Sequence, residues 1–456
     1  MNVMKFGGTS LGSPDLIIKC ADLVEREIDH NGENPLIVVS AIGGTSSQPK
    51  VTDLLLMAAE NAVKGEWEHY FKAIEDRHYE ILDGLGLPHE IACKNLRELN
   101  DLLRGIYIVR EVTPRLYDFA VSFGERISAK CFAALLRKRG HQDAEAVNSY
   151  DLGLITDSRF MAATPLDEAY ERIAEAYRKY MGKLLVVTGF IAKDKRGEIT
   201  TIGRSGSDFS AAIFGAAIGA KEIQVWKDVP GVLTADPSLV PHARALGRLS
   251  FSEASELAYY GAEVLHPATL VPAIKHGVPV RVLHTLNPEA PGTIILADTS
   301  ADHNHPVKSI VYKENQSLIN VKSERMLGSE SFMSQLFNIF ENHHIVVHML
   351  STSQVSVSLI TDVTDIERLA ALRRDLELIG KVEIEFDKTI VAVIGESMKN
   401  VIGLASRVFA AVAGAGVNLQ MISQGASEIN LAFLVDNSEI PATVQGLHRE
   451  FFEKDS

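Results

Sequence analysis

Along the first 300 residues, short runs of β-branched residues alternate with longer stretches in which apolar residues recur at helical spacing. Residues 36–39 (LIVV) and 184–187 (LLVV) are the continuous apolar runs typical of strands buried on both faces, and residues 3–6 (VMKF), apolar except at Lys5, are interpreted in the same way. Between 3–6 and 36–39, Ser13 and Pro14 precede apolar residues that recur every three or four positions, which predicts a capped helix. This order predicts an α/β fold, an open and mostly parallel sheet covered by helices.

The pattern changes twice farther along the chain. Residues 53–112 carry almost no strand pattern and predict a helical insertion in a domain that spans 1–297. Prolines, glycines and a polar run around 287–308 indicate a linker. Beyond it the sequence repeats, since LINV at 318–321 is matched by IVAV at 390–393, and each copy follows the order strand, helix, strand, strand. We therefore expect two small α+β domains, at 308–384 and 385–456.

Composition narrows the class of protein. Of 456 residues, 46% are hydrophobic and 23% charged, as in soluble globular proteins. The net charge of −14 argues against a nucleic-acid partner. Cys20, Cys93 and Cys131 have neither paired nor metal-ligand spacing, which favours reduced thiols, a cytoplasmic location and no metal bound by the protein. No apolar run approaches the roughly 20 residues of a membrane helix, so no membrane association is expected.

Glycine turns follow the predicted strands. Lys5 lies in an apolar strand that leads into Gly7 and Gly8, and Ser40 opens a turn that contains Gly43 and Gly44. Ligands of open α/β sheets bind at the carboxyl ends of strands, where backbone N–H groups are available. A buried lysine also requires an anionic partner. The alternative is an ordinary structural turn, and the GxxxxGK[ST] and GxGxxG phosphate motifs are absent.

Three further segments carry candidate chemistry. The run SFGER at 122–126 is predicted at a loop-to-helix boundary. Glu125 there would either interact favourably with the helix dipole or bind a substrate. Residues 198–208 predict a strand that leads into a helix of small residues, capped by Ser207 or Asp208. The planar guanidinium of Arg204 could bind a carboxylate through two parallel hydrogen bonds. The Asp208 carboxylate beside this arginine suits a zwitterionic substrate, which carries one positive and one negative group. The alternative is a structural role, in which Asp208 caps the helix and Arg204 forms a surface ion pair. The loops at 227–238 suit a nucleotide or simple turns.

The motifs KFGGTS, SFGER, VVTGFIA, TTIGRSGSD, KDVPGV, TADP and GAEVLHPATL, in this order, resemble aspartate kinases of the amino-acid-kinase family. The C-terminal repeat resembles their paired, ferredoxin-like ACT domains, so the resemblance covers essentially the whole chain. It implies transfer of the ATP γ-phosphate to the β-carboxylate of L-aspartate, giving 4-phospho-L-aspartate for lysine, threonine and methionine biosynthesis. It also implies Mg²⁺ carried by the ATP phosphates, amino-acid feedback through the ACT domains, and a homodimer or dimer of dimers.

The resemblance also implies a set of site residues. Lys5 would bridge the transferred phosphoryl group, with Asp208 beside it as the second catalytic residue, and Glu125 and Asp208 would hold the aspartate ammonium. The substrate side contains Ser40, Thr45, Thr52, Glu125, Gly189, Phe190, Arg204 and Ser207. The nucleotide side contains Gly7, Gly8, Lys227, Asp228, Leu233, Asp236, Ser238 and Glu263.

Some positions depart from the family pattern or leave a choice open. Ser205 stands where many relatives have glycine, and Glu263 replaces a lysine that reaches the nucleotide in some relatives. Thr45 and Thr52 compete for contact with aspartate, and we favour Thr52 as the residue that caps the next helix.

The expected effector site in the first ACT domain comprises Met326, Ser329, Val347, His348, Thr352, Ser353 and Gln354. Lysine-inhibited relatives commonly carry carboxylates where this chain has His348 and Gln354. We therefore expect threonine, or threonine with lysine, as the better effector, the alternative being lysine held by backbone carbonyls and water. The rival functions are a kinase for another acidic amino acid and an amino-acid sensor without kinase activity.

Overall fold

The computed structural model describes residues 1–45, 48–203, 205–261, 265–297, 306–324, 331–396, 398, 401–424 and 429–454. Its contacts divide the chain into two compact units. The first comprises 1–232, 247–251 and 264–299, and the second comprises 233–246, 252–263 and 300–456. Two short segments within the predicted first domain therefore cluster with the C-terminal unit.

The described part of the first unit is built on an eight-stranded sheet in the order β3-β5-β2-β1-β8-β10-β11-β9. Neighbouring strands are parallel except β10 and β11, as the sequence predicts for an α/β fold. The strands are β1 (Val3–Phe6), β2 (Leu36–Val39), β3 (Ala144–Val147), β5 (Leu184–Thr188), β8 (Ile223–Lys227), β9 (Arg248–Ser250), β10 (Val280–His284) and β11 (Thr293–Leu296). A small second sheet contains β4 (Ile155–Thr156), β6 (Ile191–Asp194) and β7 (Ile199–Thr201).

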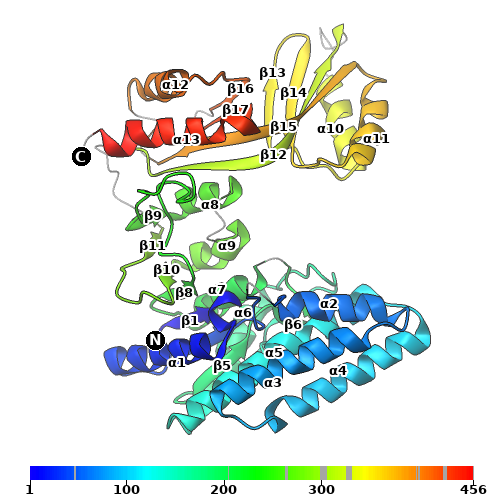
Figure 1. Ribbon diagram of the computed structural model, residues 1–456, viewed down its shortest axis with the longest axis vertical. Coiled ribbons are helices and arrows are strands. Elements are labelled where there is room, and N and C mark those ends of the chain that lie inside the picture. The colour runs from blue at the N-terminus through cyan, green and yellow to red at the C-terminus, as the bar shows by residue number, and fades with distance from the viewer. Residues whose placement is uncertain are drawn as a thin grey trace. The chain divides into compact units, whose positions relative to one another are not determined.

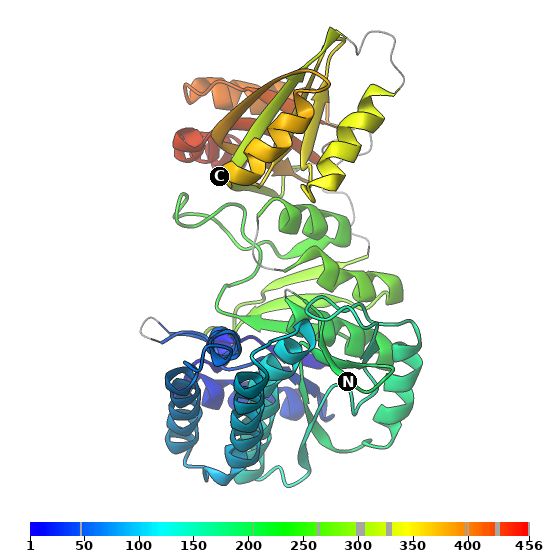
Figure 2. The same cartoon turned by 90° about the vertical axis from the view of Figure 1, so that its right-hand side faces the viewer.

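Helices cover both faces of the large sheet (Figures 1 and 2). One group contains α1 (Pro14–Asn31), α2 (Val51–Ala62), α3 (Glu68–Leu85), α4 (Glu90–Val109) and α5 (Pro114–Lys138). The other contains α6 (Glu168–Arg178), α7 (Gly206–Ile218) and α9 (Pro267–His276). The segment predicted as a helical insertion thus contains α3, α4 and most of α2, which pack beside α5.

Successive side chains of β1 point to opposite faces of the sheet. Met4 and Phe6 belong to the core formed with α1 to α5, and the Phe6 ring lies 5.7 Å from that of Phe132 in α5. Lys5 has the opposite parity, and α7 packs against β1. Lys5 is therefore directed toward α7.

The second unit contains one antiparallel sheet, whose described strands follow the order β13-β14-β12-β15-β17-β16. The strands are β12 (Ser309–Lys322), β13 (Met349–Thr352), β14 (Ser356–Thr361), β15 (Lys381–Ile394), β16 (Met421–Ser423) and β17 (Asn430–Asp436). Its helical elements are α8 (Phe251–Tyr259, whose first residue clusters with the first unit), α10 (Phe332–Asn342), α11 (Ile366–Leu376), α12 (Leu404–Gly414), η4 (Asn437–Glu439), α13 (Ile440–His448) and η5 (Arg449–Glu453).

The two repeats form two modules of this sheet that share their long strands. Residues 317–322 of β12 pair with β14, whereas 309–313 pair with 390–394 of β15. The first module packs α10 and α11 on Ile319 and Val321, and the second packs α12 and α13 around Ile310. Figure 1 shows β12 and β15 running through both modules, with α10 and α11 at one end and α12 and α13 at the other. Each long strand therefore belongs to both hydrophobic cores.

The apolar face of α10 lies mostly inside the first module. Leu336 and Phe340 are buried in its core, and Phe337 remains 40% exposed. The helical period directs Leu336 and Phe340 to the sheet.

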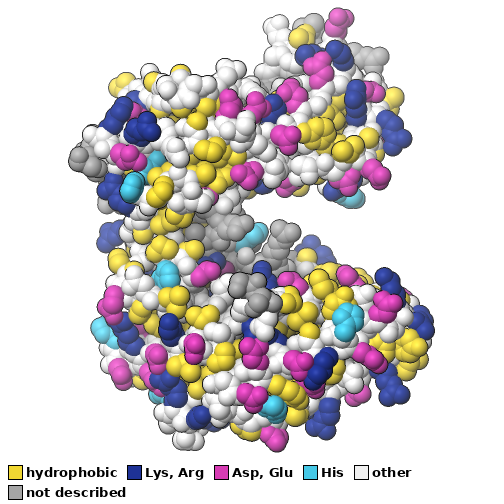
Figure 3. Space-filling model, viewed as in Figure 1, with side chains coloured by type: hydrophobic (Ala, Val, Ile, Leu, Met, Phe, Trp, Pro, Cys, Tyr) yellow, Lys and Arg dark blue, Asp and Glu magenta, His cyan; other side chains and the backbone are white. Residues whose placement is uncertain are grey.

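The surface carries mixed charge. On the face drawn in Figure 3, basic and acidic side chains are intermingled over both units. Among the described residues, no helix combines the length and apolar character that a membrane crossing requires.

Because both modules share β12 and β15, we expect them to lose stability together. Leu336→Ala removes a fully buried side chain from the first module, at a cost of about 2–5 kcal/mol. Native-state hydrogen exchange of the full chain should then show faster exchange in β17 of the second module as well as in β14. Leu378→Ala, at a 74% exposed position, is the matched control. A loss of protection confined to the first module would contradict the shared-strand argument.

Candidate active site

The predicted site residues of the first unit gather at one edge of its sheet. Lys5 lies in β1, Ser40 follows β2, Gly189 follows β5, and Lys227 ends β8. Because these four strands are parallel neighbours, their carboxyl ends lie side by side.

A buried charge cluster lies at this edge. The Lys5 Nζ is 2.5 Å from Asp208 Oδ1, and the Lys227 Nζ is 3.4 Å from Asp208 Oδ2. Lys5 and Asp208 are each 5% exposed. Burial lowers the pKa of Lys5, partly opposed by Asp208, whereas the two lysines hold the pKa of Asp208 below its usual range despite its own burial. Both lysines thus meet at one carboxylate, at the edge of the sheet where ligands of such folds bind.

The start of α7 brings Asp208 to Lys5. The predicted helix caps were wrong, because Ser207 and Asp208 lie inside the first turn and the N-cap is Ser205, which makes no side-chain cap bond. The Asp208 carboxylate is instead directed to the lysines. Ser205 has φ 53°, a backbone conformation that favours glycine.

Small residues allow α7 to approach the end of β5 closely. A Cβ at Gly189 would lie 2.7 Å from the Ser207 Cβ, and one at Gly206 would lie 2.6 Å from the Phe190 ring. Phe190 itself has φ 64°, and its N–H donates to Ser210 Oγ at 2.9 Å. Strained backbone of this kind clusters at functional sites, and it supports the choice of Phe190 as a site residue.

Glu125 was expected in a first helical turn, and this prediction was wrong. It lies in the middle of α5, and the preceding glycine allows close packing, since a Cβ at Gly124 would lie 2.7 Å from the Ala41 Cβ. Glu125 Oε1 accepts a hydrogen bond from the Ala41 N–H at 3.0 Å, directly beside Ser40. Its buried Oε2 has no partner among the described residues, and burial raises the pKa of Glu125 to about 8.

The two glycine turns after β1 and β2 contact each other. The Gly43 N–H donates to Gly8 O at 3.0 Å, and a Cβ at Gly43 would lie 2.2 Å from that oxygen. A Cβ at Gly7 would lie 3.2 Å from the Lys5 Nζ. Ser40 donates its N–H to Phe6 O at 3.2 Å. These residues form the wall of the site next to Lys5.

The choice between the two threonines stays open. Thr45 is exposed, and its N–H donates to Gln48 O at 2.9 Å. Thr52 is the second residue of α2 and does not cap it, because the N-cap is Lys50. The reason given for favouring Thr52 was therefore wrong.

The predicted nucleotide-side residues do not all belong to one unit. Asp228 directly follows Lys227 and is exposed, whereas Leu233, Asp236 and Ser238 cluster with the second unit. There the Asp236 carboxylate accepts hydrogen bonds from the Tyr312 hydroxyl at 2.6 Å and the Ser238 N–H at 2.8 Å. Arg204, Glu263, Met326 and Ser329 lie outside the described residues.

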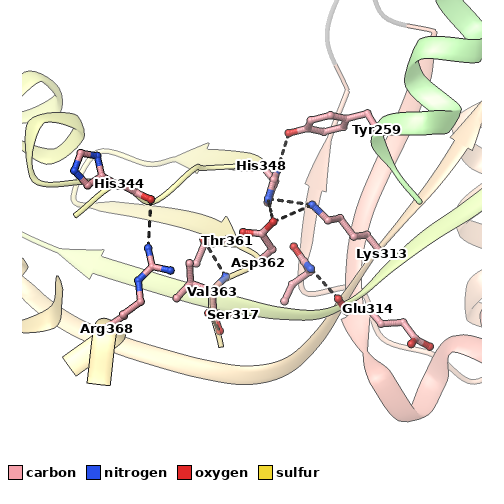
Figure 4. Close-up of polar contacts among 11 residues, drawn as sticks. Tyr259, Lys313, Glu314, Ser317, His344, His348, Thr361, Asp362, Val363 and Arg368 are labelled. Carbon is pink, nitrogen blue, oxygen red and sulfur yellow. Dashed lines mark hydrogen bonds and ion pairs between the residues drawn. The ribbon is translucent and has the colours of Figure 1, made fainter. Parts of the chain in front are cut away.

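In the second unit, the effector candidate His348 lies in a polar cluster (Figure 4). Its Nδ1 is 2.9 Å from the Tyr259 hydroxyl, and its Nε2 is 3.1 Å from both Lys313 Nζ and Asp362 Oδ2. Burial, reinforced by Lys313, lowers the pKa of His348, so the imidazole is neutral at pH 7. Sequence reasoning missed these three partners, because they come from distant segments without a shared motif.

The other described effector candidates follow His348 along the chain. Val347 is half-buried, and Thr352, Ser353 and Gln354 form the exposed turn from β13 into β14. His348 directly precedes β13, whereas Gln354 lies in the turn that follows β13, so the two candidates lie at opposite ends of this strand.

Comparisons with known proteins agree with this architecture. A model of the Amino acid kinase family matches residues 1–284, and an ACT domain model matches residues 391–451. The chain is 39% identical to Aspartokinase 1, chloroplastic, of Arabidopsis thaliana, covering 99% of this chain and 80% of that protein. It is 34% identical to Lysine-sensitive aspartokinase 3 of Escherichia coli, covering 99% of each.

Solved structures give the same result over the whole chain. E. coli aspartokinase III in complex with aspartate and ADP aligns with a TM-score of 0.83 at 33% identity, covering 99% of this chain and 100% of that one. Clostridium acetobutylicum aspartate kinase aligns with a TM-score of 0.84 at 27% identity, with the same coverage. With matched sequence and fold along essentially its full length, the chain belongs to the aspartokinases of the amino acid kinase family.

Proposed function

We propose that this chain transfers the γ-phosphoryl group of ATP to the β-carboxylate of L-aspartate, giving 4-phospho-L-aspartate. The observation that carries this proposal is the buried cluster of Lys5, Lys227 and Asp208 at the carboxyl ends of the strands. The related E. coli structure was solved with aspartate and ADP. This is the first step toward diaminopimelate, lysine, threonine and methionine.

The chemistry needs charge stabilisation more than proton transfer. A substrate β-carboxylate is ionised at neutral pH, so the reaction requires no general base. Lys5 neutralises charge on the phosphoryl oxygens, and Asp208 holds its ammonium in place. The glycine turns beside Lys5 contribute backbone N–H donors that help position the phosphoryl group.

Aspartate recognition uses the buried acid of α5. Glu125 Oε2 lacks a partner among the described residues, and an incoming ammonium group supplies one. Arg204 holds the α-carboxylate, as the family resemblance implies. Aspartate thus meets opposite charges at its two ends.

Mg²⁺ enters with the nucleotide. As the family resemblance implies, the ATP phosphates carry most of the Mg²⁺ coordination, and the ion neutralises charge on them. Asp208 is paired with two lysines.

The second unit is the regulatory part of the protein. We infer that an amino-acid effector binds at the first modules, in a homodimer or dimer of dimers. Exposed apolar side chains of the first module support an interface between copies: Phe337 of α10, Val346 before β13 and Val355 in the turn after it. We place the protein in the cytoplasm, since its three cysteines are free.

The direct test is a coupled assay of ATP consumption with L-aspartate, L-glutamate and N-acetyl-L-glutamate. We expect turnover with L-aspartate, and at least about a hundredfold lower kcat in Lys5→Ala, because transition-state charge stabilisation is lost. Lys221→Ala removes an exposed lysine of the same unit and is the control. Preference for another acceptor would overturn the proposal, and normal turnover of folded Lys5→Ala would overturn the role of Lys5.

The raised pKa of Glu125 predicts a pH dependence of aspartate use. Because its pKa is about 8 in the free protein, Glu125 is protonated below that pH and must ionise to hold an ammonium. The kcat/KM for aspartate should therefore rise about tenfold per pH unit up to about pH 8 and then level off.

Glu125→Gln should abolish this pH dependence and lower kcat/KM for aspartate roughly 10- to 150-fold, the loss of one charge-assisted bond. Glu111→Gln, at an exposed position, is its control. A flat wild-type profile from pH 6 to 8 would contradict the assignment.

The effector site predicts weak or absent inhibition by lysine alone, and stronger inhibition by threonine or by threonine with lysine. Gln354→Glu restores one carboxylate at an exposed turn and should strengthen lysine inhibition roughly 10- to 150-fold. Gln335→Glu adds the same charge elsewhere in the first module as a control. Inhibition assays with each amino acid, singly and paired, show which of them is the effector. Strong inhibition of the wild type by micromolar lysine alone would contradict the expectation.

A further inference from the structure

A buried arginine of the helical insertion contacts both glycine turns of the site. Arg77 lies on the apolar face of α3 between Ile74 and Ile81 and is only 4% exposed. Its Nη1 donates to Glu80 Oε2 at 3.0 Å, and its buried Nε has no partner among the described residues. A guanidinium is costly to bury, so its placement requires a stronger reason than filling a helix interface.

The second terminal nitrogen of the guanidinium, Nη2, contacts the glycine turns. The Arg77 Nη2 donates to Gly12 O and lies 3.5 Å from Gly43 O. Gly12 closes the short helical turn that begins after Gly8, and Gly43 belongs to the turn after β2. One side chain therefore joins the two turns that contact each other through the Gly43 N–H and Gly8 O.

The contact fixes the direction of peptide groups that would otherwise rotate. In a trans peptide the carbonyl and the following N–H point in opposite directions, so the N–H of Gly44 is directed away from Arg77. Glycine leaves its backbone the most conformational freedom of any residue. A cation bonded to these carbonyls holds the two turns in one conformation.

A second contact sets the distance of α3 from these turns. Gly84 lies on the same face of α3, two turns beyond Arg77, and a Cβ there would be 2.3 Å from Pro14 Cγ at the start of α1. The helix is thus packed directly against the segment that follows the first turn, within reach of Gly12.

We propose that Arg77 is a positioning residue for phosphoryl transfer: it holds the Gly7–Gly12 and Ser40–Gly44 turns in the conformation that places their N–H groups beside Lys5. The proposal rests on the proposed function for the chemical step only. It gives the helical insertion a role in catalysis through a residue that contacts the glycine turns of the site.

The test compares Arg77→Ala, Arg77→Lys and wild type in the coupled assay, at a temperature well below unfolding and per folded molecule. Arg77→Ala should lower kcat roughly 10- to 100-fold, with KM for aspartate and ATP changed less than about threefold. Arg77→Lys should recover little, because a single ammonium on a different stem cannot replace a planar guanidinium that bonds Glu80 through Nη1 and the turn carbonyls through Nη2. Arg97→Ala removes an exposed arginine of the insertion and should leave kcat unchanged.

Chemical rescue separates positioning from stability. Millimolar guanidinium should restore at least a third of the kcat lost in Arg77→Ala, whereas urea, which has a similar shape and no charge, should not. A variant with lowered thermal stability but unchanged kcat, or one that urea rescues equally, would overturn the proposal.

Hydrogen exchange provides a readout that is independent of turnover. In Arg77→Ala the amides of residues 7–12 and 40–45 should exchange at least tenfold faster while α3 stays protected; unchanged exchange there would overturn the proposal even if the wild type proved inactive toward aspartate. If Arg77→Ala fails to fold, Gly84→Ala, which moves α3 off Pro14, should give the same exchange and kcat changes, and a normal kcat in it would count against the role.

Discussion

The burial of Lys5 against Asp208 is the constraint on which the catalytic unit depends. An unpaired lysine inside a sheet would be strongly unfavourable, so the chain must bring a carboxylate to it from about two hundred residues away in sequence. This requires β1 at the centre of the sheet, α7 on the face that Lys5 occupies, and glycines that let α7 approach the end of β5. The second lysine, Lys227, comes from the neighbouring strand β8.

The site combines two buried ionisable groups whose pKa values shift in opposite senses. Burial lowers the pKa of Lys5 and raises that of Glu125, so each side chain lies closer to its neutral form than it would in water. In the proposed function, a phosphoryl group pairs with Lys5 and an ammonium group pairs with Glu125. Glu125 Oε2 has no partner within the described part of the chain, and the ammonium group of a zwitterionic substrate would supply one.

Sequence reasoning located β1, β2 and β5 and the glycine turns, because apolar runs and the residues that follow them are local features. It failed at Ser122–Arg126, where a glycine that permits close packing with Ala41 was taken for the start of a helix. It also gave Ser207 or Asp208 as the cap of α7, which was wrong, since a cap and a buried counter-ion have the same local pattern. The partners of His348 and Arg77 depend on tertiary contacts, and the one local signal was a charged residue on the apolar stripe of α3.

The shared strands of the second unit have a consequence for how such a protein can be rebuilt or can evolve. A cut at the boundary between the sequence repeats would fall within or beside β15, whose two halves serve different cores. Neither repeat would then keep its complete set of strands. Recombination that replaces a regulatory module must therefore exchange half-strands at two separate places, within β12 and within β15. The two repeats therefore cannot be exchanged independently of each other during evolution. New effector preferences arise more readily by substitution within this unit than by exchange of a module.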